Sequence, residues 1–131
     1  MTTFSRRTAL ATTLLGVIAP HAFAQTYPDR PITLVVPYPA GAAVDGNGRA
    51  LAAELSKHLG QPVVVDNVGG ASGTIGSDTV RRADPDGYTL LFNASLFVLG
   101  KTVVPTCPYD PVTDFRPIAQ AGEAPLVLLA N

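Results

Sequence analysis

Two short stretches of small residues are the part of this sequence best suited to binding a ligand. Residues 40–43 (Ala-Gly-Ala-Ala) and residues 69–76 (Gly-Gly-Ala-Ser-Gly-Thr-Ile-Gly) each follow an apolar run and lead into a helical pattern. A loop of small residues at the start of a helix presents bare backbone N–H groups and the positive end of the helix dipole, and both favour an anion. The sequence therefore predicts anion binding at both loops.

Nucleophilic and metal chemistry find little support. Cys107 is the only cysteine, and we interpret it as a partly buried small side chain between Pro105 and Pro108. A thiol nucleophile needs a base, and the only histidine beyond the leader is His58, on a predicted helix distant in sequence. One histidine and one cysteine do not make up the three or four ligands of a metal site. We predict neither an enzyme nor a metal or other cofactor.

The first 24 residues have the pattern of an export signal. Arg6 and Arg7 precede an apolar run over residues 9–19, and Ala22 and Ala24 suit a cleavage before Gln25. The arginine pair partly matches a twin-arginine signal, so the route is either Sec or twin-arginine. No later segment is long enough for a transmembrane helix. These features predict a periplasmic protein whose mature chain does not insert into the membrane.

Charge disfavours nucleic acid as a partner. The chain has nine Lys and Arg, two of them in the leader, against ten Asp and Glu. The mature chain is therefore mildly acidic, whereas nucleic-acid-binding domains are basic. The length of 131 residues suits a single domain.

The first loop lies between a predicted strand and a predicted helix. Residues 32–36 form an apolar, β-branched run that ends at Pro37. The helix is expected to begin at Val44 or Asp45 and to end at Gly60, with leucines at 51, 55 and 59 forming its apolar stripe. The glycines at 46 and 48 indicate either close backbone approach or a frayed helix start.

The remaining chain continues the alternation of strands and helices. Further strands are predicted over 62–65 (ended by Asp66 and Asn67), 88–92, 118–121 and 126–129, and short helices from the second loop to residue 82 and over 96–104. A β-α-β-α-β order implies a doubly wound, mainly parallel α/β sheet. Ligands bind such sheets at the carboxyl ends of the strands. Both small-residue loops and Ser95 are expected at that edge.

Four segments, in order and with consistent spacing, resemble the Bug family of exported solute-binding proteins. They are PYPAGAAVD (37–45), NVGGASGTIG (67–76), DPDGYTLLF (84–92) and CPYDPVTDFRPIA (107–119). These proteins are the receptors of tripartite tricarboxylate transporters. The resemblance runs from about Tyr27 to the end of the chain.

The resemblance implies a fold, a ligand and a partner. The fold is a type II periplasmic-binding-protein fold, whose two lobes close on a small carboxylate held by backbone amides and ordered waters. The partner is the membrane part of the transporter. The positions carried over are Tyr38, Ala40, Gly41, Ala42 and Asp45 in the first loop, Gly70, Ala71, Ser72, Gly73 and Thr74 in the second, and Ser95 in the third. Residues 25–131 correspond to the N-terminal part of domain 1, without the second lobe.

The sequence departs from the family pattern at three loop positions. Ala42 stands where the family usually has the second of two glycines, Gly69 where proline is common and Ser72 where glycine is common. If Ala42 needs a positive φ, the alanine costs on the order of 1 kcal/mol and narrows the anion cradle. For Asp45, capping of the first helical turn is at least as good an interpretation as ligand contact. Arg49 is expected to face solvent.

Two other functions remain open. The spacing of Gly70, Gly73 and Gly76 resembles a dinucleotide-binding loop in an enzyme, although no acid follows the next strand to bind a ribose. Alternatively, the chain is a truncated remnant that binds nothing, because a partial lobe exposes sheet edge and core surface. On this account the isolated chain is marginally stable or prone to aggregate, and it binds carboxylates poorly.

Overall fold

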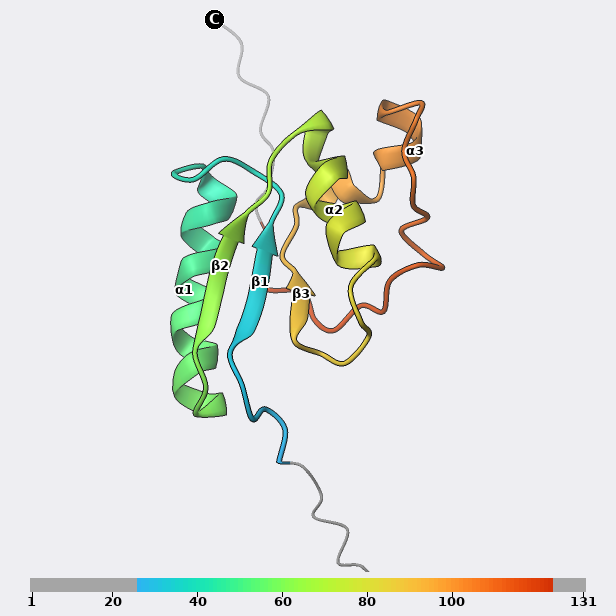
Figure 1. Cartoon of the computed structure of the whole chain (residues 1–131). Coiled ribbons are helices and arrows are strands. Elements are labelled where there is room, and N and C mark those ends of the chain that lie inside the picture. The colour runs from blue at the N-terminus through green and yellow to red at the C-terminus, as the bar shows by residue number, and fades with distance from the viewer. Residues whose placement is uncertain (1–25, 124–131) are drawn as a thin grey trace, which may run out of the picture.

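A parallel three-stranded sheet forms the centre of the structure, which is a computed structural model describing residues 26–123 (Figure 1). The strands are β1 (Ile32–Val36), β2 (Val63–Asn67) and β3 (Thr89–Leu91), in the spatial order β2-β1-β3. Both pairings of β1 are parallel, with Leu34 opposite Val65 in β2 and Leu90 in β3. The predicted doubly wound α/β arrangement is confirmed.

The two main helices lie on opposite faces of the sheet. Helix α1 (Ala43–Leu59) connects β1 to β2, and α2 (Thr74–Arg81) connects β2 to β3 on the other side of β1. Right-handed crossovers in opposite directions place the two helices on opposite faces. Alternate side chains of β1 agree with this: Ile32 and Leu34 belong to the core under α1, whereas Pro37 lies against α2.

The face of the sheet under α1 is the main hydrophobic core. Its fully buried members are Ile32, Leu34, Ala52 and Val63, and the half-buried leucines 55 and 59 of α1 pack against them. Gly60 ends the helix in the left-handed conformation (φ 68°), as predicted, and its amide donates to the Ser56 carbonyl. A Cβ at Gly48 would lie 3.0 Å from Val36 Cγ2, so this glycine allows close approach. At Gly46 a Cβ would meet nothing within 4 Å.

The third strand leads into a small aromatic cluster. A 3₁₀ turn, η2 (Ser95–Phe97), precedes the four-residue helix α3 (Gly100–Val103). The ring of Phe97 stacks on Tyr109 at a centroid distance of 5.2 Å and meets Phe115 edge-on at 5.0 Å. The short helix predicted over 96–104 is confirmed only over Gly100–Val103, and a 3₁₀ turn precedes it where Phe97 packs against Tyr109.

Two strand predictions also need correction. Strand β2 does not stop before Asp66: both Asp66 and Asn67 pair with β1, opposite Val35 and Val36. Residues 118–121 are not a strand, and Ile118 is 80% exposed. An extended segment is stable only with a partner, and within residues 26–123 none pairs with it. The strand predicted over 126–129 lies outside the described residues.

Helix α2 packs most closely at Gly76, and this contact generates the first prediction. A Cβ at this position would lie 2.4 Å from the Val68 carbonyl oxygen and 2.8 Å from Pro37 Cβ. We expect Gly76→Ala to lower the free energy of unfolding by at least about 2 kcal/mol, because backbone must move to admit the methyl group. Urea unfolding followed by circular dichroism measures the change.

Gly46→Ala is the matched control. It places the same methyl group in a helix with nothing within 4 Å, so it should stabilise the chain by about 1 kcal/mol through helix propensity. Equal effects of the two substitutions would contradict the packing of α2 described here.

Candidate functional site

The carboxyl ends of the three strands bring three loops together at one edge of the sheet, which we call the rim. It consists of residues 37–42 after β1, 68–73 after β2 and 92–95 after β3. A Cβ at Gly69 would be 3.6 Å from the Pro39 nitrogen, which places the first two loops side by side. The Tyr38 hydroxyl donates to Asn93 Oδ1 at 3.0 Å, which joins the first loop to the third.

Asp45 organises the first loop from the first turn of α1. Its side chain is buried (3% exposed), and its carboxylate accepts hydrogen bonds from the Gly41 amide (2.8 Å), Arg49 Nε (3.0 Å) and Asn67 Nδ2 (2.9 Å). The Arg49 guanidinium, the Gly41 amide and the Asn67 amide together lower the pKa of Asp45 from 3.8 to about 2. Asp45 therefore binds a loop amide and links the loop to the sheet, and it makes no side-chain cap bond to the first turn of α1.

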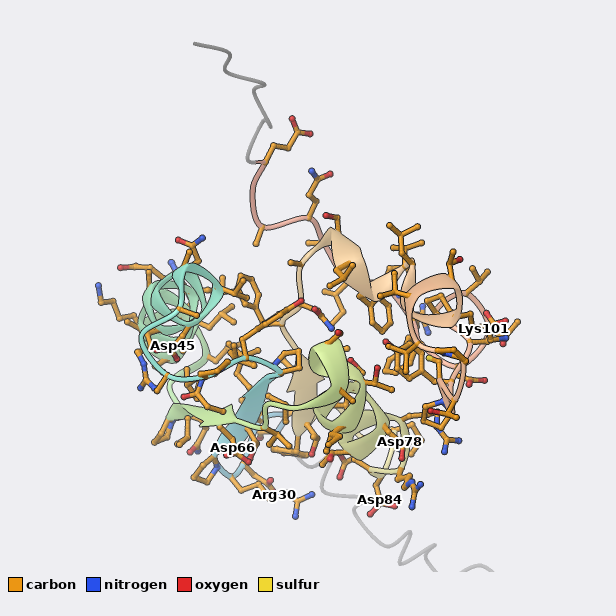
Figure 2. The ribbon with its side chains drawn as sticks, turned by 90° about the horizontal axis from the view of Figure 1, so that it is seen from above. Arg30, Asp45, Asp66, Asp78, Asp84 and Lys101 are labelled. Atoms are coloured by element: carbon orange, nitrogen blue, oxygen red, sulfur yellow. The ribbon has the colours of Figure 1, made fainter. Side chains whose placement is uncertain are left out.

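Arg49 is half-exposed but not free. Besides its bond to Asp45, its Nη2 donates to Asn67 Oδ1 at 2.8 Å. Asn67 also donates to the Tyr38 carbonyl at 3.1 Å, so it bonds to the first loop twice. Figure 2 shows Asp45 on α1 and Asp78 on α2, on opposite sides of the strands. Asp78 forms its own ion pairs with Arg81 and Arg82.

Two backbone amides of the first loop that were predicted to bind the ligand already donate to acceptors within the protein. The Gly41 amide donates to Asp45, and the Ala42 amide donates to the Pro39 carbonyl at 3.2 Å. Ala42 has φ −69° and ψ 159°, an extended conformation that any residue adopts. Its alanine therefore carries no strain, and the positive φ of this loop belongs to Gly41 (φ 85°).

The second loop has an unusual backbone. Four consecutive residues have positive φ: Gly70 (125°), Ala71 (45°), Ser72 (57°) and Gly73 (88°). The left-handed region costs a non-glycine residue about 1 kcal/mol, so the strain expected at Ala42 lies at Ala71 and Ser72. A Cβ at Gly70 would be 2.7 Å from Ile75 Cδ1, but that methyl group ends a half-exposed side chain that can move, so it is the φ of 125° that favours glycine here.

Hydrogen bonds at its end hold this left-handed turn. The Gly73 amide donates to the Gly70 carbonyl at 2.9 Å, and the Thr74 amide donates to the Ala71 carbonyl. Among the hydrogen bonds formed within residues 26–123, none uses the amides of Ala71 or Ser72 as donors. Successive N–H groups in such a turn form a concave anion-binding surface. The second loop is therefore the part of the rim best prepared for an anion.

Ser95 lies at the rim but apart from these bonds. It begins η2, its side chain is exposed, and its carbonyl accepts from the Val98 amide. The polar residue that contacts the other loops is Asn93, two positions earlier, which sequence reasoning did not select. Asn67 and Ser77 were missed in the same way. The available signal was an asparagine at or just after the carboxyl ends of β2 and β3, the two strands that flank β1.

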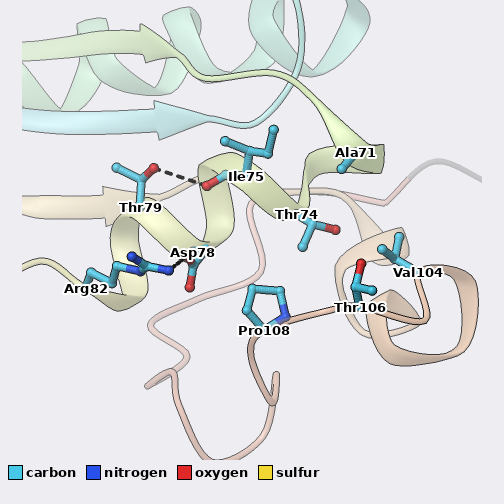
Figure 3. A pocket seen from close by; sticks show the side chains of 9 residues that line it. All are labelled: Ala71, Thr74, Ile75, Asp78, Thr79, Arg82, Val104, Thr106 and Pro108. Atoms are coloured by element: carbon cyan, nitrogen blue, oxygen red, sulfur yellow. Dashed lines mark hydrogen bonds and ion pairs between the residues drawn. The ribbon is translucent and has the colours of Figure 1, made fainter.

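An open groove lies beside the rim rather than on it. It has a volume of about 360 Å³ and runs between α2 and the segment 104–108 (Figure 3). Its lining comprises Ala71, Thr74, Ile75, Asp78, Thr79, Arg82, Val104, Thr106 and Pro108. Only Ala71 and Thr74 belong to the predicted set. Cys107 is half-buried nearby, with its thiol 3.6 Å from the Tyr109 carbonyl oxygen.

Two further findings concern the described residues as a whole. Between residues 26 and 123, no helix is long and apolar enough to cross a membrane. In the same part of the chain, no group of three or more His, Cys, Asp and Glu side chains is placed to hold a metal ion.

Fold and rim together define a partial α/β lobe of the periplasmic-binding-protein type, and comparison gives the family. The sequence profile of the tripartite tricarboxylate transporter family receptors matches residues 48–131. The chain therefore belongs to this family of substrate-binding receptors.

Individual relatives support this assignment. Protein BugT of Bordetella pertussis is 44% identical over 118 residues, covering 88% of this chain and 36% of BugT. A protein of Pseudomonas sp. strain P51, encoded in the tcbD-tcbE intergenic region, is 42% identical over 127 residues, covering 95% of this chain and 38% of its own length. The chain thus spans less than two-fifths of the length of these relatives.

Two solved structures show the same fold. MatC from Rhodopseudomonas palustris with bound malate has a TM-score of 0.61 and 36% identity, covering 70% of this chain and 31% of MatC. A structure described as a periplasmic transporter has a TM-score of 0.60 and 41% identity, covering 66% of this chain and 29% of that protein.

The position of Asp45 predicts a specific acid sensitivity. Because its folded-state pKa is about 2 and its ordinary value is 3.8, Asp45 stabilises the fold above pH 3.8, and this contribution is lost as the pH falls through 2. In that window wild-type protein should take up about one more proton on unfolding than Asp45→Asn. Urea midpoints measured from pH 2 to pH 5 give the difference. Asp110→Asn is a positive comparison, because Lys101 lowers the pKa of Asp110 to about 2 as well, so this variant should lose proton uptake in the same window. Equal pH dependence in wild type and Asp45→Asn would contradict the assignment.

The left-handed conformation of Ser72 yields a second test. Ser72→Gly should raise the free energy of unfolding by about 0.5 kcal/mol, because relief of the strain exceeds the entropic cost of glycine. Ser95→Gly serves as the control, since Ser95 has no positive φ and glycine there should destabilise by about 0.5–1 kcal/mol. A loss of stability in Ser72→Gly as large as in Ser95→Gly would show that Ser72 is not left-handed.

Proposed function

We propose that this chain carries part of the carboxylate-binding site of an exported, periplasmic solute receptor that serves a tripartite tricarboxylate transporter. In this proposal the ligand carboxylate lies on the rim, and the Ala71 and Ser72 amides are its principal donors. The other loop positions, from Tyr38 to Asp45 and from Gly70 to Thr74, shape the cradle, and Ser95 borders it. The membrane components of the transporter are the partner of the whole receptor.

The observation that carries the proposal is the left-handed run in the second loop. Two amides are held without an internal partner among the described residues, in a conformation that costs energy and is fixed by its own hydrogen bonds. A carboxylate accepts several charge-assisted hydrogen bonds from such donors, without the desolvation of a basic side chain. The malate bound to the related MatC is a ligand of this class.

The family assignment bears on the alternatives. Membership among substrate-binding receptors supports a receptor over a dinucleotide-binding enzyme. Within the loop, Gly76 packs against Pro37 and the Val68 carbonyl, so this glycine serves the packing of α2. The other alternative, a chain that binds no ligand, is distinguished from a receptor by a binding measurement.

The test is a calorimetric and thermal-shift titration of the 131-residue chain with malate. We expect weak binding, with a Kd of about 1 mM, or roughly 4 kcal/mol, because the chain spans only part of its relatives' length. Neutral malamide and NAD should give no shift. Equal shifts with malate and malamide, or none with tens of millimolar malate, would contradict the proposal. A shift with NAD would favour the dinucleotide alternative.

A pair of charge variants locates the site. Ala71→Asp places a carboxylate beside the proposed donors, and aspartate tolerates left-handed backbone better than alanine. Like-charge repulsion should weaken malate binding about tenfold. Ala53→Asp, on the exposed face of α1, makes the same change in net charge and should leave the Kd unaltered. Equal weakening by both variants would place the ligand elsewhere.

A further inference from the structure

We propose that Asn93 is a positioning residue that holds the three rim loops as one unit, and that the Ser77 hydroxyl extends its hold to the second loop. The inference uses the rim of the proposed function, but the hydrogen bonds that support it are formed by the chain without a ligand. Neither residue belongs to the set that the loop motifs single out.

Four hydrogen bonds make up this unit. Asn93 Oδ1 accepts from the Tyr38 hydroxyl at 3.0 Å and from the Ala94 amide at 2.8 Å. Asn93 Nδ2 donates to Ser77 Oγ at 3.0 Å, and Ser77 Oγ donates to the Gly73 carbonyl at 2.8 Å. Tyr38 belongs to the first loop, Ala94 to the third and Gly73 to the second. One side chain therefore reaches all three loops, directly or through a single hydroxyl.

Backbone groups at the two ends determine the direction of every bond. The Ala94 N–H can only donate, so Asn93 must present its oxygen there and its NH₂ to Ser77. The Gly73 carbonyl can only accept, so the single Ser77 hydroxyl proton must point to it. Tyr38 must then donate to Asn93. With these directions each of the four bonds joins one donor to one acceptor.

Because the unit is largely buried, breaking any of its hydrogen bonds is costly. Ser77 is fully buried (0% exposed), and Asn93 and Tyr38 are half-buried. A buried polar group that loses its partner costs more than the bond itself contributes. The Gly73 carbonyl lies at the end of the left-handed turn, so its bond to Ser77 fixes the peptide plane that follows the Ala71 and Ser72 amides. Asn93 is therefore expected to control the geometry of donors it does not touch.

Amide hydrogen exchange of the full chain, measured by NMR without ligand, tests this coupling. Tyr38→Phe should speed exchange of the Gly73 amide, and Ser77→Ala should speed exchange of the Ala94 amide, each about three- to tenfold relative to the Val35 amide in the sheet. In each variant the reporter amide lies in a different loop from the substitution. A purely local structural role would leave the exchange rate of that amide unchanged.

Asn93→Asp isolates the direction of the bonds. The substitution preserves shape, but an aspartate at position 93 only accepts, and the one Ser77 proton cannot serve both that carboxylate and the Gly73 carbonyl. The Gly73 amide should then exchange faster relative to Val35, whereas the Ala94 amide keeps a carboxylate oxygen as its acceptor and should stay protected. If a position 93 variant does not fold, the Gly73 exchange rate in Tyr38→Phe, which removes a single hydroxyl, tests the coupling instead.

Thr79→Val is the matched control. The Thr79 hydroxyl donates to the Ile75 carbonyl four residues back at 3.1 Å, as Ser77 does to Gly73, but from the exposed face of the same helix. This variant should leave the Ala94 rate unchanged. The inference is overturned if Tyr38→Phe and Ser77→Ala affect only their own loops, or if Asn93→Asp leaves Gly73 protected. Coupling found in a chain that shows no malate binding would retain this inference and reject the proposed function.

Discussion

The rim depends first on one buried charge. An ionised carboxylate away from water is tolerated only with strong hydrogen-bond partners, and Asp45 has three, one each from the loop after β1, from α1 and from the end of β2. Satisfying that charge determines the turn at Gly41, the placement of Arg49 and the side-chain direction of Asn67. The loop that was expected to hold an anion from outside is thus built around an anion of its own.

The regular elements could be predicted where local pattern and tertiary contact agree. Strand β1, helix α1 and the left-handed Gly60 follow from an apolar run, a leucine stripe and a terminal glycine. The last residues of β2 could not be predicted from the local sequence pattern. Asp66 and Asn67 resemble turn residues, but the ladder to β1 continues past them because Val35 and Val36 offer partners. The strand prediction for residues 118–121 was wrong for the opposite reason, because this strand-like segment has no pairing partner among residues 26–123.

The candidate site shows a similar division. The sequence indicates which loops occupy the rim, because topology alone places the carboxyl ends of parallel strands together. It does not indicate which amides are already bonded, nor which residue has positive φ. Those depend on contacts distant in sequence, such as Pro37 against Gly76 and Asn67 with Asp45. The strain anticipated at Ala42 therefore lies one loop further on, at Ala71 and Ser72.

The second loop combines strain with rigidity, and the two have a common source. A left-handed alanine and serine persist only where the surroundings determine the backbone more strongly than its local preference. Here the determinants are the Gly73 and Thr74 amides, the Ser77 hydroxyl and the close packing of α2 on Pro37. None of them requires a ligand, so the cost of arranging the donors is met by folding rather than by binding. Preorganised amides of this kind lose little on association, and this is how the proposed site would hold a carboxylate without a committed basic side chain. In that proposal Gly76 and Ser77 contribute to the binding geometry, although both are buried in the interior of the lobe.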